Sequence, residues 1–271
     1  MRNVNAHYSQ DPRKEWDRLN KDAFRKLEFR TTLHYLDAHL PKRGLVLDAG
    51  GGPGRYTIEL ARRGYDVVLL DLVGKNLRFA ERMIKRKGVC DRVRGVRQGD
   101  ITKLDRIEDN SFDAVLCTGG PLSHVMRDAK RRDAVAELMR VAKRGAPVFI
   151  SVMSRLSTVL NVGLMPNLQP ELTHKYFREF VRTGDYDGQR GFTAFHGFMR
   201  QEFVDLLEGQ GLSIEKIVAL EGCGSYAIPS LNRLERNLPK QWEEWQRIHY
   251  ETCELQEVAD VSDHILAVCR K

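Results

Sequence analysis

The sequence lacks three features that would assign it to large classes of protein. No apolar run in the 271 residues approaches the roughly 18 residues that cross a bilayer, so we expect no membrane partner. Residues 1–16 contain no apolar block like that of a secretory signal, which predicts a cytoplasmic protein. The five cysteines are odd in number and form no C-x-x-C pair. They therefore indicate neither a disulfide framework nor a cysteine-ligated metal, and we expect no metal site.

Acidic residues are in deficit, since 44 Lys and Arg stand against 37 Asp and Glu, which gives a formal net charge of +7. Such an excess is typical of nucleic-acid-binding proteins. Much of it, however, lies at the ends of predicted helices, where Lys or Arg precedes Gly64, Gly88 or Gly145. Cations there oppose the negative end of the helix dipole, and glycine takes the left-handed cap. A nucleic-acid partner therefore stays open but is not favoured.

What the sequence does contain is an alternation of short apolar runs with amphipathic stretches. The runs predict strands at residues 45–49, 67–71, 93–97, 112–117 and 147–152, and the stretches predict helices at 54–63, 75–87 and 128–143. They are mostly runs of β-branched residues or leucine without polar alternation, which is typical of strands buried on both faces. The order predicts an α/β fold with a doubly wound, mostly parallel sheet.

A glycine-rich loop, "DAGGGPG", follows the first predicted strand. Loops at this end of a parallel sheet bind ligands, and glycine lets a chain turn tightly and a ligand approach closely. A dinucleotide-binding loop needs the pattern G-x-G-x-x-G. If the pattern starts at Gly50, the third glycine position is Arg55, and if it starts at Gly52, that position is Thr57, so the dinucleotide spacing is absent. The loop instead follows D-x-G-x-G-x-G from Asp48 to Gly54. An acidic side chain at its base repels phosphate and suits a cationic ligand.

This pattern resembles the class I S-adenosylmethionine-dependent methyltransferases, whose D/E-x-G-x-G-x-G loop holds the methionine half of the cofactor. The resemblance extends in register over residues 44–152 and resumes at about 198–220 and 264–270. It implies a Rossmann-like fold with a seven-stranded sheet. It also implies S-adenosylmethionine as cofactor and S-adenosylhomocysteine as product.

Further positions of the family pattern follow in order. Asp71, seventeen residues after Gly54, stands where the family binds both ribose hydroxyls, and Asp100 with Ile101 stands where it recognises adenine. Taken alone, each of these two acids could equally cap the following helix. The resemblance implies these cofactor-binding residues: Asp48, Gly50, Gly51, Gly52, Gly54, Asp71, Leu72, Asp100, Ile101, Cys117, Thr118 and Gly119, with Tyr8 from an N-terminal segment folded over the cofactor.

Two histidines are candidates for a catalytic base, which an oxygen or nitrogen acceptor needs only if it must lose a proton. His124 follows the fourth strand, and His196 lies just before the helical pattern that starts near residue 200. Each is alternatively an ordinary half-buried residue. Methyl transfer otherwise depends on holding the acceptor and the methyl group in line.

The class of methyl acceptor is indicated mainly by two sequence motifs that the chain lacks. The fourth strand is followed by "CTGGPLSH", without the Asn/Asp-Pro-Pro-Tyr tetrapeptide of amino-methylating relatives or the Pro-Cys pair of cytosine C5 methylation. The family's small-molecule enzymes tend to carry an aromatic-rich segment after the fifth strand, as this chain does. We expect a small-molecule acceptor methylated on O or N. RNA or protein methylation, and a catalytically silent S-adenosylmethionine-binding module, are the alternatives.

The remaining patterns divide the chain into six predicted segments. One amphipathic pattern runs from residue 11 to 39, before Pro41, and two insertions interrupt the later part of the sheet domain. The segments are an N-terminal helical lid (1–40), a cofactor-binding core (41–152), a substrate cap (153–197), the core continued (198–221), a second helical insertion (222–262) and a final core strand (263–271).

Overall fold

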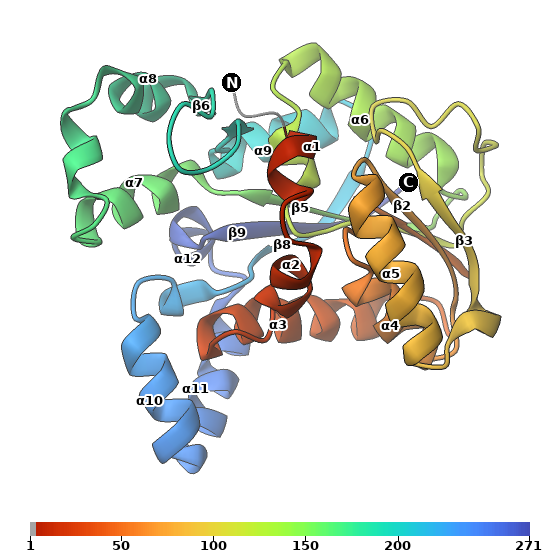
Figure 1. Ribbon diagram of the computed structural model, residues 1–271, viewed down its shortest axis with the longest axis horizontal. Helices are drawn as coiled ribbons and strands as arrows, with labels where there is room; N and C mark the ends of the chain where they lie inside the picture. Colours follow the sequence, from red (N-terminus) through yellow and green to blue (C-terminus); the bar gives the residue numbers. More distant parts are fainter. Residues whose placement is uncertain (1–3) are drawn as a thin grey trace.

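A computed structural model describes residues 4–271 and contains a seven-stranded sheet with helices on both faces (Figure 1). The strands are β1 (Leu45–Ala49), β2 (Asp66–Asp71), β3 (Val93–Gln98), β4 (Ala114–Cys117), β5 (Pro147–Met153), β8 (Ser213–Ala219) and β9 (His264–Arg270). Their order is β3-β2-β1-β4-β5-β9-β8, and β9 runs antiparallel to both of its neighbours. The doubly wound, mostly parallel Rossmann-like fold predicted from the sequence is confirmed.

The central strands form where the sequence is apolar without alternation. Every residue of β4 and the first six residues of β5 are buried, as expected for strands covered on both faces. The fourth strand begins at Ala114, two residues later than predicted, because Phe112 makes only an isolated bridge to Ala142. β3 lies at the sheet edge and has no fully buried residue.

Two helical layers cover the sheet. α3 (Ala23–His39), α4 (Arg55–Arg62) and α5 (Gly74–Arg86) pack on one face, and α6 (Asp128–Val141) and α9 (Arg200–Glu208) pack on the other (Figure 1). Gly64, Gly88 and Gly145 adopt φ angles of 92°, 68° and 74°. Gly64 and Gly88 directly follow the C-cap residues of α4 and α5, so the predicted left-handed caps are confirmed at these two positions. The prediction is wrong for Gly145, because α6 ends at Val141 with an extended Ala142, and Gly145 lies in a turn beyond the helix.

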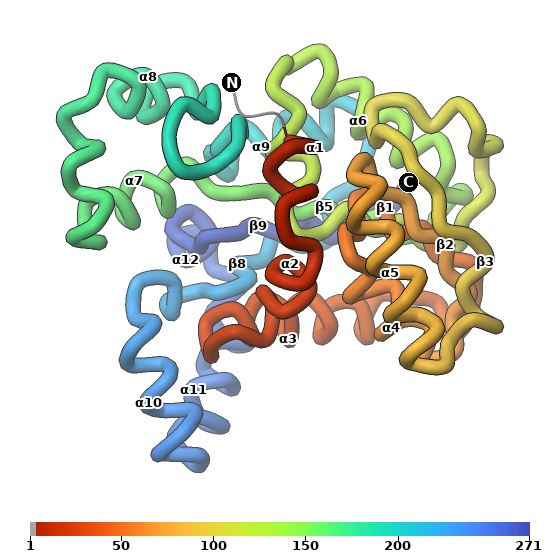
Figure 2. The backbone as a smooth tube through the Cα atoms, in the orientation of Figure 1, coloured from red at the N-terminus to blue at the C-terminus, as the bar shows by residue number. Residues whose placement is uncertain are grey.

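The N-terminal pattern predicted as one amphipathic stretch is divided into separate helices. α1 (Val4–Tyr8) and α2 (Pro12–Arg18) cross the carboxyl edge of the sheet before α3 begins (Figures 1 and 2). The break occurs because the Asp22 carboxylate caps α3 and accepts a hydrogen bond from the Arg25 amide. The first three residues of the predicted lid lie outside the described residues.

Two helical segments interrupt the sheet domain. Between β5 and α9 lie α7 (Arg155–Leu164), α8 (Lys175–Thr183) and a hairpin of β6 (Asp185–Tyr186) and β7 (Phe195–His196). Between β8 and β9 lie α10 (Ile228–Asn237), α11 (Pro239–Thr252) and α12 (Gln256–Val261). α10 packs on α3, and the α10–α11 pair projects away from the sheet (Figure 2).

Short 3-10 turns complete the connections: η1 (Cys90–Arg92), η2 (Pro121–His124), η3 (Gln169–Thr173) and η4 (Gly222–Gly224). Across residues 4–271, we find no helix that combines the length and the apolar character needed to cross a membrane.

Candidate functional site

A cavity of about 1360 Å³ lies at the carboxyl edge of the sheet, where open α/β folds bind ligands. Its walls come from the loops after β1 to β4, from α1, α2 and the start of α3, from the first insertion and from the start of β9. Ten of the thirteen predicted cofactor-binding residues line it: Tyr8, Gly50, Gly51, Gly52, Asp71, Leu72, Asp100, Ile101, Thr118 and Gly119. Asp48, Gly54 and Cys117 do not line it.

The glycine loop presents bare backbone to the cavity at Gly52. This residue has a φ of 55°, a left-handed conformation that favours glycine. A Cβ atom built there would meet only Asn76 Nδ2, at 3.9 Å, so a side chain at this position would extend into open space. The Gly52 amide donates a hydrogen bond of 2.9 Å to Asp71 Oδ2, which ties the loop to the end of β2.

Asp48 supports the glycine loop from beneath. Its side chain is 1% exposed, and Oδ2 accepts hydrogen bonds from the Thr57 amide (3.0 Å) and hydroxyl (2.6 Å) in the first turn of α4. Burial raises the pKa of this carboxyl to about 6. The side chain contacts the start of the helix rather than the cavity, so any attraction for a cationic ligand acts from behind the loop.

Asp71 joins two of the loops that line the cavity. Oδ1 accepts a hydrogen bond of 2.8 Å from the Val73 amide, while Oδ2 binds the Gly52 amide. Burial raises the pKa of the Asp71 carboxyl. Asp100, by contrast, is exposed and accepts a hydrogen bond from the Thr102 amide, beside the buried Ile101.

The segment after β4 places a hydroxyl and a glycine in the cavity wall. Thr118 Oγ1 is buried and has no hydrogen-bond partner among residues 4–271. Gly119 has a φ of 82°, and its amide donates to Ser151 Oγ at 2.8 Å. Cys117 lies behind them, where burial raises the pKa of its thiol to about 12. Among the predicted residues at the end of β4, Thr118 therefore keeps a hydroxyl without a hydrogen-bond partner in the described chain.

His124 lines the cavity at the end of η2 and connects two other segments. Its Nδ1 lies 2.9 Å from the Ala194 carbonyl oxygen, which fixes the ring proton on Nδ1. Nε2 then accepts a hydrogen bond of 2.9 Å from the Tyr8 hydroxyl. Burial lowers the pKa of His124 to about 4 and raises the pKa of Tyr8. At neutral pH the ring is uncharged.

His196 does not line the cavity, so the structure separates the two candidate histidines. Its ring is 2% exposed, with Nδ1 2.7 Å from Asp185 Oδ1 and Nε2 2.6 Å from Glu202 Oε1. These contacts join the β6–β7 hairpin to α9. His196 therefore has both nitrogens engaged by carboxylates away from the other predicted residues.

A buried ion-pair network was missed by the sequence analysis. The Arg18 guanidinium donates to both carboxylate oxygens of Glu28 (2.6 and 2.9 Å) and to Glu15 Oε1 (2.8 Å). Beside it, His264 Nδ1 lies 2.6 Å from Glu221 Oε1. Arg18, Glu28 and His264 line the cavity. Ten residues separate Arg18 from Glu28, and 43 separate Glu221 from His264, so no local motif indicates these contacts.

Comparisons with known proteins agree on one domain type. A sequence profile described as a methyltransferase domain matches residues 46–145. The glycine/sarcosine N-methyltransferase of Parasynechococcus marenigrum is 32% identical over 137 residues, so the match spans about half of each chain, 50% of this one and 47% of that relative. The ubiquinone biosynthesis O-methyltransferase of Nitrosospira multiformis is 31% identical over 198 residues, which cover 71% of this chain and 76% of that protein.

Solved structures share the fold. A Burkholderia thailandensis 1,6-didemethyltoxoflavin-N1-methyltransferase with bound 1,6-didemethyltoxoflavin and S-adenosylhomocysteine has a TM-score of 0.53, covering 92% of this chain and 78% of its own. A protein of Pyrococcus horikoshii has a TM-score of 0.58, covering 89% and 90%. Both are 17% identical to this chain, so the likeness is one of fold.

Proposed function

Because this chain belongs to the class I S-adenosylmethionine-dependent methyltransferases, we propose that it transfers the methyl group of S-adenosylmethionine to an oxygen or nitrogen of a small molecule. The observation that carries the proposal is the size of the cavity. Its volume of about 1360 Å³ exceeds the roughly 300–1,000 Å³ of an ordinary ligand pocket. Such a cavity has room for the cofactor and a small acceptor side by side.

In this proposal, the predicted residues at the ends of β1 to β4 hold the cofactor. The bare backbone at Gly52 leaves space for the methionine half, and the Asp71 carboxylate accepts hydrogen bonds from the ribose hydroxyls. Asp100 and Ile101 bind the adenine ring. The unpartnered hydroxyl of Thr118 supports a ligand at this wall, because a buried polar atom without a partner costs stability. When bound, the cofactor supplies an electrophilic methyl group on a sulfonium.

The Tyr8–His124 pair provides a path for a proton released by the acceptor. The neutral His124 ring presents an unprotonated Nε2 to the Tyr8 hydroxyl. As the Tyr8 oxygen takes the proton of an acceptor hydroxyl, its own proton passes to Nε2, which leaves the ring cationic and the acceptor oxygen nucleophilic. An amine acceptor that is already neutral needs no such step before it attacks.

The N-terminal helices and the first insertion enclose the cavity. Trp16 of α2 lies under the Arg55 guanidinium, at 4.8 Å, and Phe192 of the first insertion forms part of the wall. An enclosed site excludes water and strengthens electrostatic contacts inside it. These contacts support a lid and a substrate cap, and an acceptor small enough to be enclosed.

Both acceptor atoms stay in the proposal because the relatives' names include an N-methyltransferase and an O-methyltransferase. RNA or protein methylation has only the net charge of +7 in its favour. A protein that binds S-adenosylmethionine without transferring its methyl group would need no proton path.

A transfer assay with methyl-labelled S-adenosylmethionine tests this function. The protein is incubated with a panel of small amines, phenols and hydroxy acids, and separately with bulk RNA and denatured protein. We expect label in a small-molecule product. Label found in the RNA or protein fraction alone would contradict the small-molecule assignment, and tight S-adenosylhomocysteine binding with no transfer to any class would favour the silent module.

Asp71→Ala is expected to weaken S-adenosylhomocysteine binding about 10- to 100-fold, because a hydrogen bond to a charged group contributes roughly 1.5–3 kcal/mol. The variant also loses some stability, since two backbone amides lose their acceptor. Calorimetry measures the affinity. Asp66→Ala is the matched control: Asp66 starts the same strand, pairs with Arg94 and lies outside the cavity. An equal loss in both variants would remove Asp71 from the site.

A further inference from the structure

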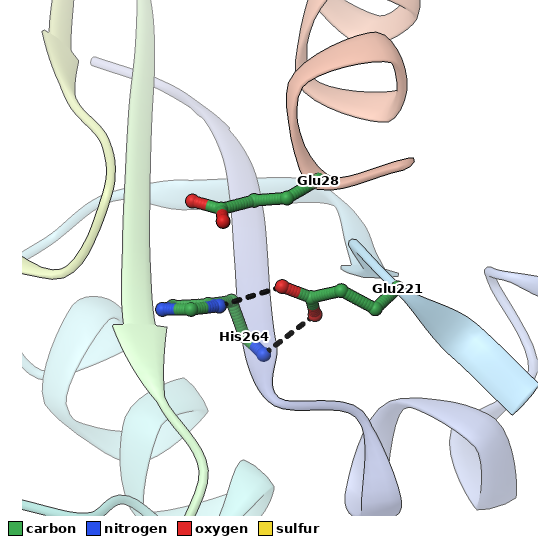
Figure 3. A group of neighbouring side chains, drawn as sticks. All are labelled: Glu28, Glu221 and His264. Carbon is green, nitrogen blue, oxygen red and sulfur yellow. Dashed lines mark hydrogen bonds and ion pairs between the residues drawn. The ribbon is translucent and has the colours of Figure 1, made fainter. Parts of the chain in front are cut away.

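His264 presents an unused ring nitrogen to the cavity. It is the first residue of β9, paired across the sheet with Met153 at the end of β5, and both residues line the cavity. Nδ1 faces Glu221 Oε1 at 2.6 Å, and the backbone amide donates to Glu221 Oε2 at 2.8 Å. Figure 3 shows the other end of the ring pointing away from Glu221. Within residues 4–271, Nε2 has no hydrogen-bond partner.

The surroundings keep this ring protonated. Burial alone would lower the pKa of His264, but the attraction of Glu221 and Glu28 outweighs burial and raises the pKa to about 9. Glu28 lies above the ring in Figure 3. At neutral pH the imidazolium therefore donates through Nδ1 to Glu221 and retains a second N–H, on Nε2, directed away from it.

The same three side chains approach one another closely enough to resemble a metal site, with ligand atoms all within 4.8 Å. Their bonding argues against a metal. Glu28 already accepts two hydrogen bonds from Arg18, and a metal-binding histidine must present an unprotonated nitrogen. The cluster is instead a network of two ion pairs.

Arg18 adds further donors to the same wall. It has five N–H groups, of which three serve Glu15 and Glu28. A Cβ atom on Gly119, at the end of β4, would lie 3.7 Å from Arg18 Nη2. The guanidinium therefore reaches the part of the cavity next to β4 and β5, with two N–H groups to which no partner is assigned in the described chain.

The acidic groups near these cations are already engaged. Glu15, Glu28 and Glu221 each bind Arg18 or His264. Asp263 accepts hydrogen bonds from the Ser157 hydroxyl and the Asn161 amide, and burial raises the pKa of its carboxyl. Arg18 and His264 thus keep charge-assisted donors that a ligand can meet.

We propose that His264 Nε2 and the free Arg18 N–H groups form a subsite for an anionic oxygen, a carboxylate or a phenolate, of the methyl acceptor. The inference rests on the proposed function for the presence of an acceptor, but the binding it describes does not depend on turnover. Charge-assisted hydrogen bonds are shorter and stronger than neutral ones, so this subsite discriminates an anion from its neutral isostere. His264 is then a specificity-determining residue.

Binding of matched probes tests the subsite. Benzoate is compared with benzamide, and 4-nitrophenolate with 4-nitroanisole, by calorimetry with and without saturating S-adenosylhomocysteine. We expect the anion to bind roughly 10- to 100-fold more tightly than its neutral partner in at least one pair, and that pair identifies the source of the oxygen. Equal affinities within both pairs would overturn the proposal. Failure of S-adenosylhomocysteine to bind would instead count against the proposed function.

His264→Gln removes the charge of the ring and is expected to reduce the preference for the anion, because only the Arg18 donors remain, whereas His196→Gln, outside the cavity, keeps the full preference. Because loss of the ion pair with Glu221 can unfold the variant, a second measurement uses the unchanged protein. Nitrogen NMR follows the titration of the His264 ring. The bound anion is expected to raise the ring pKa, and the neutral probe to leave it unchanged, because the coupling between proton and anion is reciprocal. An unchanged titration with bound anion contradicts the subsite.

Discussion

Gly52→Val is expected to abolish binding of S-adenosylhomocysteine while the protein still folds. The nearest protein atom to a Cβ at this position is 3.9 Å away, so the valine side chain occupies cavity space rather than displacing neighbours. That space is where the backbone meets the methionine half of the cofactor in our proposal. Calorimetry on the purified variant measures the affinity.

The control for Gly52→Val must separate backbone strain from ligand exclusion. A β-branched residue in the left-handed region costs on the order of 1–3 kcal/mol wherever it stands. Gly88→Val carries the same strain, because Gly88 has a φ of 68°, open space around its Cβ position and no contact with the cavity. We expect both variants to lose similar stability and Gly88→Val alone to keep its affinity. Wild-type affinity in Gly52→Val would place the cofactor elsewhere.

His124→Ala is expected to lower kcat about 100-fold, at the lower end of the usual scale for a lost proton transfer, with affinity for S-adenosylhomocysteine retained. The lower end applies because burial holds the pKa of this ring near 4, which makes it a weak base. Steady-state kinetics with the acceptor found in the transfer assay measures kcat and KM separately. The effect applies to an acceptor that must lose a proton.

Two variants test whether His124 acts through Tyr8. Tyr8→Phe removes the hydroxyl that donates to Nε2 and should lower kcat as much as His124→Ala, with little further loss in the double variant. His196→Ala removes a histidine that binds Asp185 and Glu202 outside the cavity, so it should lower stability and leave kcat close to normal. Equal kcat losses in His124→Ala and His196→Ala would point to general destabilisation.

The sheet could be predicted because its information is local. A strand buried on both faces needs an apolar run without polar alternation, and Val67 to Leu70 and Ala114 to Cys117 provide such runs in β2 and β4. Lysine or arginine followed by glycine also marked the ends of α4 and α5 correctly, but not the end of α6, where the chain leaves the helix at Ala142, three residues before Gly145. The N-terminal helices were harder: the apolar spacing continues across residues 19–22, and only the capping side chain of Asp22 indicates the break.

The site could be predicted only in part. The residues that line the cavity after β1 to β4 follow a fixed order along the chain, so a motif can indicate them. His264 could not be found in this way, because its partner Glu221 precedes it by 43 residues and is brought near by the antiparallel strand β9. His196 was selected for its place in the sequence, but the β6–β7 pairing sets it beside Asp185 instead.

The central claim, that the cavity binds S-adenosylmethionine, is tested most directly by thermal unfolding with S-adenosylmethionine, S-adenosylhomocysteine and NAD. A ligand at about a hundred times its dissociation constant adds roughly 2.7 kcal/mol of stability, which for a domain of this size raises Tm by roughly 5–10 °C. We predict that both sulfur ligands raise Tm and that NAD does not, because the loop lacks the dinucleotide spacing. Stabilisation by NAD alone would contradict the account.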